Sequence, residues 1–145
     1  MPSPDARRLV LRNHLAELNR LAVWIEGWAQ NSVFPDVSFA LQLCLEEAVA
    51  NVIMYGGSDR GLEIAVELER RGGTLVARIE DNGQPFDPTQ ISPPPPASSL
   101  KDAKIGDLGI HLMRSFAGHL DYERRNGRNR LTLRFDEPQA ARRQP

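Results

Sequence analysis

Apolar and polar positions change period several times along the chain, and each change marks a predicted element. Residues 14–30 carry apolar side chains every three to four positions, which is the spacing of a helix with one buried face. Residues 36–55 are mostly apolar and are followed by two glycines that stop a helix, with Asp36 or Ser38 expected as its N-cap. The pattern therefore predicts two successive helices, preceded by a short strand over residues 6–12.

The second half of the chain alternates apolar and polar residues with the period of strands. Four segments alternate in this way: residues 62–68, 75–81, 120–124 and 131–135. A Gly-Gly pair joins the first two segments, and an Asn-Gly pair typical of a hairpin joins the last two. Residues 83–105 are loop-like, and a third helix is expected to begin near Gly109. We expect an α+β fold, in which one mixed, mostly antiparallel sheet is covered on one face by three helices.

Composition and charge restrict the classes of partner. The chain has 145 residues and a formal net charge of -1, so it has no bulk attraction for nucleic acid or an anionic membrane, and we expect neither as a partner. No apolar run approaches the ~20 residues of a membrane span, and a single cysteine excludes an internal disulfide. We expect a cytoplasmic protein with one domain over residues 6–136 and a polar tail over residues 137–145.

Two polar residues of the second helix fall in an apolar sector, whereas Ser38, Gln42 and Glu46 fall in a different one. Glu47 and Asn51 are four positions apart and share one face of that helix, in a sector that also carries Leu43, Cys44 and Met54. A buried carboxylate or amide without a partner is costly, so a ligand or a metal would explain both side chains. The alternative is a partly exposed glutamate beside a locally bonded asparagine. Spacing alone does not separate these interpretations.

Asp81 ends the second predicted strand on its apolar face. It follows Leu75, Ala77 and Ile79 in alternation and is therefore predicted to point toward the core. Gly83 leaves room for a backbone or a ligand to approach, and a carboxylate at a strand end is a good acceptor for an exocyclic amino group. Asp-Asn-Gly is also ordinary turn chemistry, so a turn without a ligand is the alternative.

A glycine pair precedes the third predicted helix. Gly106 and Gly109 lie where free backbone N–H groups at a helix N-terminus favour phosphate. The segment is not a dinucleotide-binding fingerprint, because the third glycine and the leading strand are missing. It is not a Walker loop, because no Gly-Lys-Ser/Thr follows. A phosphate-binding loop and an ordinary helix start are the two interpretations.

These three segments, in this order and spacing, resemble the N, G1 and G2 boxes of the GHKL, or histidine-kinase-like, ATPase superfamily. Within it the chain is similar to the anti-sigma-factor serine/threonine kinases of the RsbW-like group, over about residues 6–135. The matching segments are Leu45–Asn51, Glu80–Pro88, Ile105–Arg114 and Tyr122–Leu133. The resemblance implies a Bergerat-type two-layer sandwich that binds ATP and Mg²⁺.

The resemblance also implies roles for single residues. Glu47 would be the catalytic general base, and Asn51 would bind ATP by holding its Mg²⁺. Asp81 would accept a hydrogen bond from the adenine amino group. The other implied ATP-binding residues are Gly83, Phe86, Lys104, Gly106 and Gly109. Few reactive groups are needed, because phosphoryl transfer depends mainly on positioning and charge neutralisation.

The implied activity is an ATP-dependent protein serine/threonine kinase directed at an anti-anti-sigma (STAS-domain) protein. A sigma factor would be the second partner, and the assembly would be a homodimer. Asp107 stands where this group usually has a glycine, and Ile105 stands where it often has a basic residue. These departures favour the alternative, a nucleotide-binding module that sequesters its partner without transferring phosphate. A sensor histidine kinase domain and a domain without nucleotide are further alternatives.

Overall fold

The computed structural model describes residues 6–30, 35–57, 61–90, 111 and 113–136. The elements are β1 (Arg7–Arg12), α1 (Glu17–Ala29), α2 (Pro35–Tyr55), β2 (Glu63–Arg71), β3 (Thr74–Asp81), the 3₁₀ turn η1 (Pro88–Gln90), β4 (His119–Arg125) and β5 (Arg128–Asp136). Residues 111 and 113–116 are helical and belong to the third predicted helix. The expected start of that helix near Gly109 lies outside the described residues.

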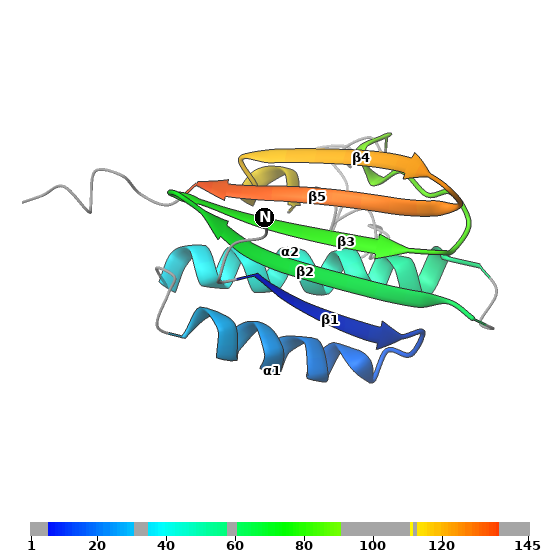
Figure 1. Ribbon diagram of the computed structural model, residues 1–145, viewed down its shortest axis with the longest axis horizontal. Coiled ribbons are helices and arrows are strands. Elements are labelled where there is room, and N and C mark those ends of the chain that lie inside the picture. The colour runs from blue at the N-terminus through cyan, green and yellow to red at the C-terminus, as the bar shows by residue number, and fades with distance from the viewer. Residues whose placement is uncertain (1–5, 31–34, 58–60, 91–110, 112, 137–145) are drawn as a thin grey trace, which may run out of the picture.

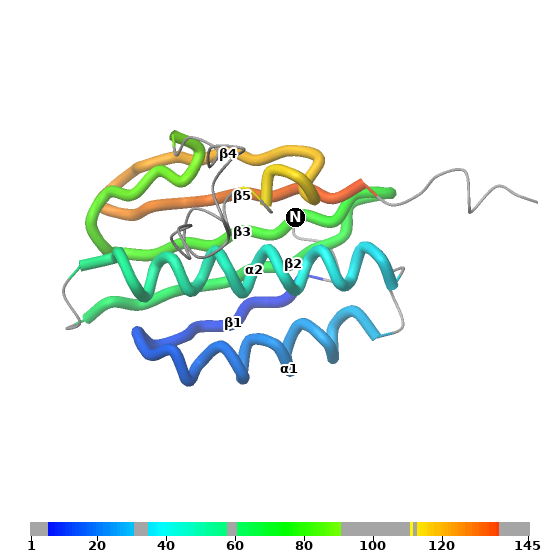
Figure 2. Tube along the Cα trace, turned by 180° about the vertical axis from the view of Figure 1, so that it is seen from behind, coloured from blue at the N-terminus to red at the C-terminus, as the bar shows by residue number. Residues whose placement is uncertain are grey.

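A five-stranded sheet forms one layer of the molecule, in the order β1-β2-β3-β5-β4 (Figure 1). Helices α1 and α2 and the third helix lie together on one face of it (Figure 2). The predicted α+β sandwich is therefore confirmed. All four strand pairings are antiparallel, so the described strands contain none of the parallel pairs that a mixed sheet requires. The reason is connectivity, since β2–β3 and β4–β5 are hairpins and the α1–α2 helix pair returns the chain beside β1.

Left-handed turn residues close the two hairpins. Asn126 and Gly127 have φ values of 53° and 75°, as a two-residue type I′ turn requires, so the predicted Asn-Gly hairpin is confirmed. Because β5 then pairs with β3 along its whole length, Asn129 stands opposite Asp81. This register brings together two side chains that are 48 positions apart in the sequence.

The hydrophobic core lies between the sheet and the helices. Every layer contributes fully buried side chains, among them Leu11, Leu21, Leu41, Ile79 and Met113. Met113 ties the third helix to this core. Trp24 and Trp28 pack against it as partly buried side chains.

Helix α2 is the central helix of the second layer. Its 21 residues are long and apolar enough to cross a membrane, with a mean hydropathy of 1.5, so the expectation that no segment reaches this length is wrong on length and composition. Leu41, Leu45 and Val49 recur at four-residue spacing and are fully buried. The apolar side of α2 therefore packs on the sheet, as in the core helix of a folded domain.

The start of α2 differs from the prediction. The helix begins at Pro35, and proline is favoured at the first helical position because its fixed φ suits a helix and the N–H it lacks would have no partner there. Asp36 and Ser38 lie inside the helix, so neither is its N-cap. Asp36 instead places a negative charge in the first turn, where the helix dipole favours it.

Replacing a leucine of this core tests the packing. We expect Leu41→Ala to lower the free energy of unfolding by about 2–5 kcal/mol, because it leaves a cavity under α2. Leu15→Ala is the matched control, since Leu15 is 57% exposed and its replacement should change stability by no more than about 0.5 kcal/mol. Urea unfolding measures both variants, and equal losses would contradict the assigned core.

Candidate functional site

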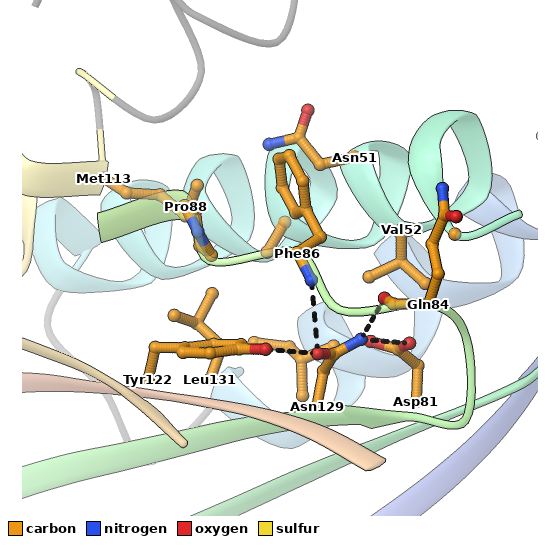
Figure 3. A pocket seen from close by; sticks show the side chains of 13 residues that line it. Asn51, Val52, Asp81, Gln84, Phe86, Pro88, Met113, Tyr122, Asn129 and Leu131 are labelled. Atoms are coloured by element: carbon orange, nitrogen blue, oxygen red, sulfur yellow. Dashed lines mark hydrogen bonds between the residues drawn. The ribbon is translucent and has the colours of Figure 1, made fainter. Parts of the chain in front are cut away.

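A pocket lies between α2, the end of β3 and the β4–β5 hairpin (Figure 3). It contains about 430 Å³ of empty volume, part of which is open to solvent. The rest of its lining is apolar or glycine, but five polar residues also line it: Asn51, Asp81, Gln84, Tyr122 and Asn129. An apolar pocket with a few convergent polar groups is typical of a small-molecule site.

Asn51 reaches this pocket from α2. Its side chain is 3% exposed, and its Nδ2 atom has no hydrogen-bond partner among the described residues. A buried amide group that makes no hydrogen bond is costly, so the pocket lacks a partner that a ligand would supply. Rotation of the amide by a half-turn presents Oδ1 in the same place, and that oxygen suits a hard cation. The sequence indicated that a buried polar group here would need a partner, and Nδ2 of Asn51 is buried without one among the described residues.

Asp81 lies on the opposite side of the pocket from Asn51, with Phe86 between them (Figure 3). It is 3% exposed, so the prediction that it points inward is confirmed. Oδ1 of Asp81 accepts hydrogen bonds from the backbone N–H of Gly83 (2.9 Å) and from Nδ2 of Asn129 (3.0 Å). Among the described residues no donor reaches Oδ2, so this oxygen is available to a ligand. One oxygen of Asp81 makes the turn contact that Asp-Asn-Gly predicts, and the other has no donor among the described residues and could accept one from a ligand.

Gly83 allows a close backbone approach, which is one of the two uses that its sequence position indicated. A Cβ atom at this position would lie 2.5 Å from the carbonyl oxygen of Gly56, so the absent side chain lets the loop approach the end of α2. Gly83 does not line the main pocket. The next residue fastens this contact, because Gln84 donates from its backbone N–H to Gly56 O (2.9 Å) and from Nε2 to Tyr55 O (2.8 Å). These bonds satisfy carbonyl groups at the C-terminus of α2.

Glu47 is half-buried one helical turn before Asn51 and does not line the pocket. Burial raises the pKa of the Glu47 carboxyl, and the negative charge of Glu46 raises it further. A carboxylate with a raised pKa is better matched to proton transfer near neutral pH. Cys44, one turn earlier on α2, is buried. Burial raises the pKa of its thiol to about 12, which disfavours the thiolate form that a nucleophilic cysteine needs.

The remaining candidates divide between the pocket wall and the undescribed part of the chain. Phe86 lines the pocket and stacks on Tyr55 with ring centroids 5.5 Å apart. Lys104, Gly106 and Gly109 lie outside the described residues, as do the departures at Ile105 and Asp107. Within the described ranges no group of His, Cys, Asp and Glu is placed to hold a metal. A cation here would therefore depend on Asn51 and on oxygen atoms of the ligand.

The sequence analysis missed Asn129 as a site residue. Asn129 is 5% exposed and lies on β5, where polar side chains are common on the open face of the sheet. Its parity in the strand was a usable signal, because Asn129 shares the inward face with Leu131 and Leu133. That Asp81 is its neighbour across the sheet could be inferred only from the β3–β5 register.

Comparison with known proteins bears on this geometry. Residues 11–135 match the family described as histidine kinase-like ATPase domain. The chain belongs to this family. The serine/threonine-protein kinase BtrW of Bordetella bronchiseptica is 42% identical to this histidine kinase-like ATPase domain over 98 residues, which are 66% of this chain and 68% of that protein. The predicted resemblance to the anti-sigma-factor kinases is therefore confirmed, and ATP is the nucleotide that such a domain binds.

Solved structures agree on the fold of this ATPase domain. The structure of the RsbU and RsbW domains of a Mycobacterium tuberculosis protein matches 94% of this chain with a TM-score of 0.64 and 15% identity. The chain spans 33% of that protein chain. The histidine kinase domain of a blue-light-activated kinase from Erythrobacter litoralis matches 85% of this chain and 60% of its own, with a TM-score of 0.53 and 15% identity. At these identities the likeness shows the fold alone.

The contact between Gly83 and the end of α2 can be tested with alanine. We expect Gly83→Ala to lower the free energy of unfolding by about 1–3 kcal/mol, because the new methyl group overlaps the Gly56 carbonyl. Gly27→Ala in α1 is the control, since a Cβ there meets nothing within 4 Å and alanine is the better helix former by about 1 kcal/mol. Thermal unfolding measures both variants. A Gly83→Ala protein as stable as the parent would refute the close approach.

Proposed function

We propose that this domain binds Mg-ATP in the pocket and transfers the γ-phosphoryl group to a serine or threonine of an anti-anti-sigma (STAS-domain) protein. The proposal is carried by two polar atoms on opposite sides of one apolar pocket, Nδ2 of Asn51 and Oδ2 of Asp81, neither of which has a hydrogen-bond partner among the described residues. A nucleotide offers a flat base with an amino donor at one end and phosphates at the other. Membership of the family and the kinase relative support the same interpretation.

Asp81 would recognise the base. Oδ2 accepts a hydrogen bond from the exocyclic amino group of adenine, while Ile79, Leu131 and Phe86 provide apolar surface for the ring. Guanine carries a carbonyl oxygen at the corresponding ring position, and this oxygen would face the carboxylate without a proton between them. The site should therefore prefer adenine to guanine, because an unpaired buried acceptor is costly.

Asn51 and Glu47 would serve the phosphate end. Mg²⁺ bound by an amide oxygen of Asn51 and by phosphate oxygens would neutralise the charge of the triphosphate. Glu47 would take the proton of the attacking hydroxyl, and its raised pKa supports this role. Lys104, Gly106 and Gly109 are proposed to contact the phosphates on the strength of the sequence resemblance.

A sigma factor is the proposed second partner, with the domain acting as a homodimer in the cytosol. An alternative function is that of a module that binds nucleotide and sequesters a partner without phosphotransfer. Two observations favour it. Asp107 replaces a glycine and Ile105 replaces a basic residue in the segment proposed to contact phosphate. Glu47 also lies outside the pocket lining.

Incubation with radiolabelled Mg-ATP and a candidate STAS-domain protein distinguishes these functions. Kinase activity predicts phosphoserine or phosphothreonine on the partner. A stable complex without phosphate on the partner would favour the sequestering module. Failure of the purified domain to bind Mg-ATP would reject both.

Asp81→Asn tests the base assignment. We expect the affinity for Mg-ATP to fall about tenfold or more, because the amide replaces a charged acceptor at a buried site, where one such bond contributes roughly 1.5–3 kcal/mol. Calorimetric titration measures the change. Asp121→Asn on β4 makes the same substitution at a side chain that is 56% exposed, so it should leave affinity unchanged. Unaltered binding by Asp81→Asn would remove Asp81 from the site.

The pH dependence of transfer tests Glu47. If the carboxylate is the base, the rate falls as pH drops through a pKa above the ordinary ~4.3 of glutamate. Glu46→Gln removes a negative charge that raises this pKa, so the acid limb of the rate profile should move to lower pH. Glu47→Gln should keep ATP binding and lower transfer by roughly 10²–10⁴-fold. A Glu47→Gln protein with full activity, or an acid limb that moves upward in Glu46→Gln, would contradict the assignment.

A further inference from the structure

Asn129 is a buried polar residue of the pocket to which the proposed kinase chemistry gives no task. We propose that Asn129 is a positioning residue for base recognition, whose amide fixes the Asp81 carboxylate and the start of the following loop so that the base site exists before nucleotide arrives. Asn129 stands opposite Asp81 across the β3–β5 pair and is 5% exposed. The inference rests on the proposed function, because ATP is the ligand that this site would receive.

The amide of Asn129 uses all of its hydrogen-bonding capacity on one side of the pocket (Figure 3). Nδ2 donates to Oδ1 of Asp81 (3.0 Å) and to the carbonyl oxygen of Gln84 (2.8 Å). Oδ1 accepts from the backbone N–H of Phe86 (3.3 Å) and from the phenol of Tyr122. An amide has two donor hydrogens and two acceptor positions, and all four are filled. One side chain thus joins β3, the loop that follows it and β4.

This arrangement determines which oxygen of Asp81 faces a ligand. Two donors hold Oδ1, the amide of Asn129 and the backbone N–H of Gly83, while no described residue donates to Oδ2. The carboxylate cannot turn Oδ2 away from the pocket without breaking both bonds. A group already held in its binding orientation loses less freedom when ligand arrives, and this contributes directly to affinity.

An amide fits this position and a carboxylate does not, although the two have the same shape. The substitution Asn129→Asp would place oxygen 3.0 Å from Oδ1 of Asp81 and also beside the Gln84 carbonyl. Two carboxylates at this distance raise the pKa of one of them, since both cannot remain charged at low cost. The other charged or titratable groups around them are Tyr122 and Arg124 on β4 and Asp87 in the loop.

The test compares Asn129→Asp with Asn126→Asp in the intact chain. Asn126 lies in the exposed β4–β5 turn with φ of 53°, which aspartate tolerates, so this control adds the same charge on the same hairpin away from the pocket. Calorimetry gives the Kd for Mg-ATP of each variant and of the wild type at about pH 8 and about pH 6, because a carboxyl group that is both buried and beside a second carboxylate can take up a proton in this range. The ratio to wild type cancels the protonation of the nucleotide itself.

We expect Asn129→Asp to bind Mg-ATP at least about tenfold more weakly than wild type near pH 8. The deficit should shrink near pH 6, because the added carboxyl takes up a proton and donates it to Asp81 as Nδ2 does. Asn126→Asp should match wild type at both pH values. Wild-type affinity in Asn129→Asp, or a deficit that does not respond to pH, would overturn the inference.

A second measurement needs neither a variant nor nucleotide. Side-chain amide exchange followed by NMR should be slow for Asn129 and fast for Asn126 in the nucleotide-free wild type, because only the first amide is bonded on both hydrogens. Equally fast exchange would overturn the inference even if Asn129→Asp fails to fold. Failure of the wild type to bind Mg-ATP would reject the proposed function, and the exchange measurement would still decide the role of Asn129.

Discussion

The hydrogen bond between Nδ2 of Asn129 and Oδ1 of Asp81 joins the two central strands at the point where β3 leaves the sheet. The same asparagine bonds the phenol of Tyr122 and the carbonyl oxygen of Gln84 in the loop after β3. Gln84 in turn bonds the end of α2 through its backbone N–H. The polar residues that the sheet presents to the pocket, Asp81, Tyr122 and Asn129, are therefore joined in one hydrogen-bond network. A buried network of this kind is specific because each member must be satisfied.

Helix α2 supplies the opposite side of the site and does so as a rigid element. Its apolar face is buried against the sheet, so Asn51 is held within the pocket although no described residue bonds its Nδ2 atom. Gln84 bonds carbonyl groups at the end of the same helix and also offers its own carbonyl to Asn129. Gln84 thus forms hydrogen bonds both with the helix that carries Asn51 and with the asparagine that contacts Asp81.

Periodicity predicted the elements and the layer architecture, because burial of one face dictates both helical spacing and strand alternation. It also predicted that Asp81 points inward. It missed the start of α2 at Pro35, since local cap preferences compete with proline at the first helical position. Alternation along β5 could have placed Asn129 on the inward face. Its partner Asp81 is set by strand register across 48 residues, which no local pattern encodes. The role of Gly83 depends equally on a tertiary contact, with Gly56.

If Asn51 and Asp81 hold the two ends of one nucleotide, a crystal structure with Mg²⁺ and a non-hydrolysable ATP analogue is the most direct test. We expect the adenine amino group at Oδ2 of Asp81, the metal at the amide of Asn51 and the Asp81–Asn129 bond unchanged. An analogue bound elsewhere, or a base that leaves the Asp81 carboxylate without a contact, would contradict it.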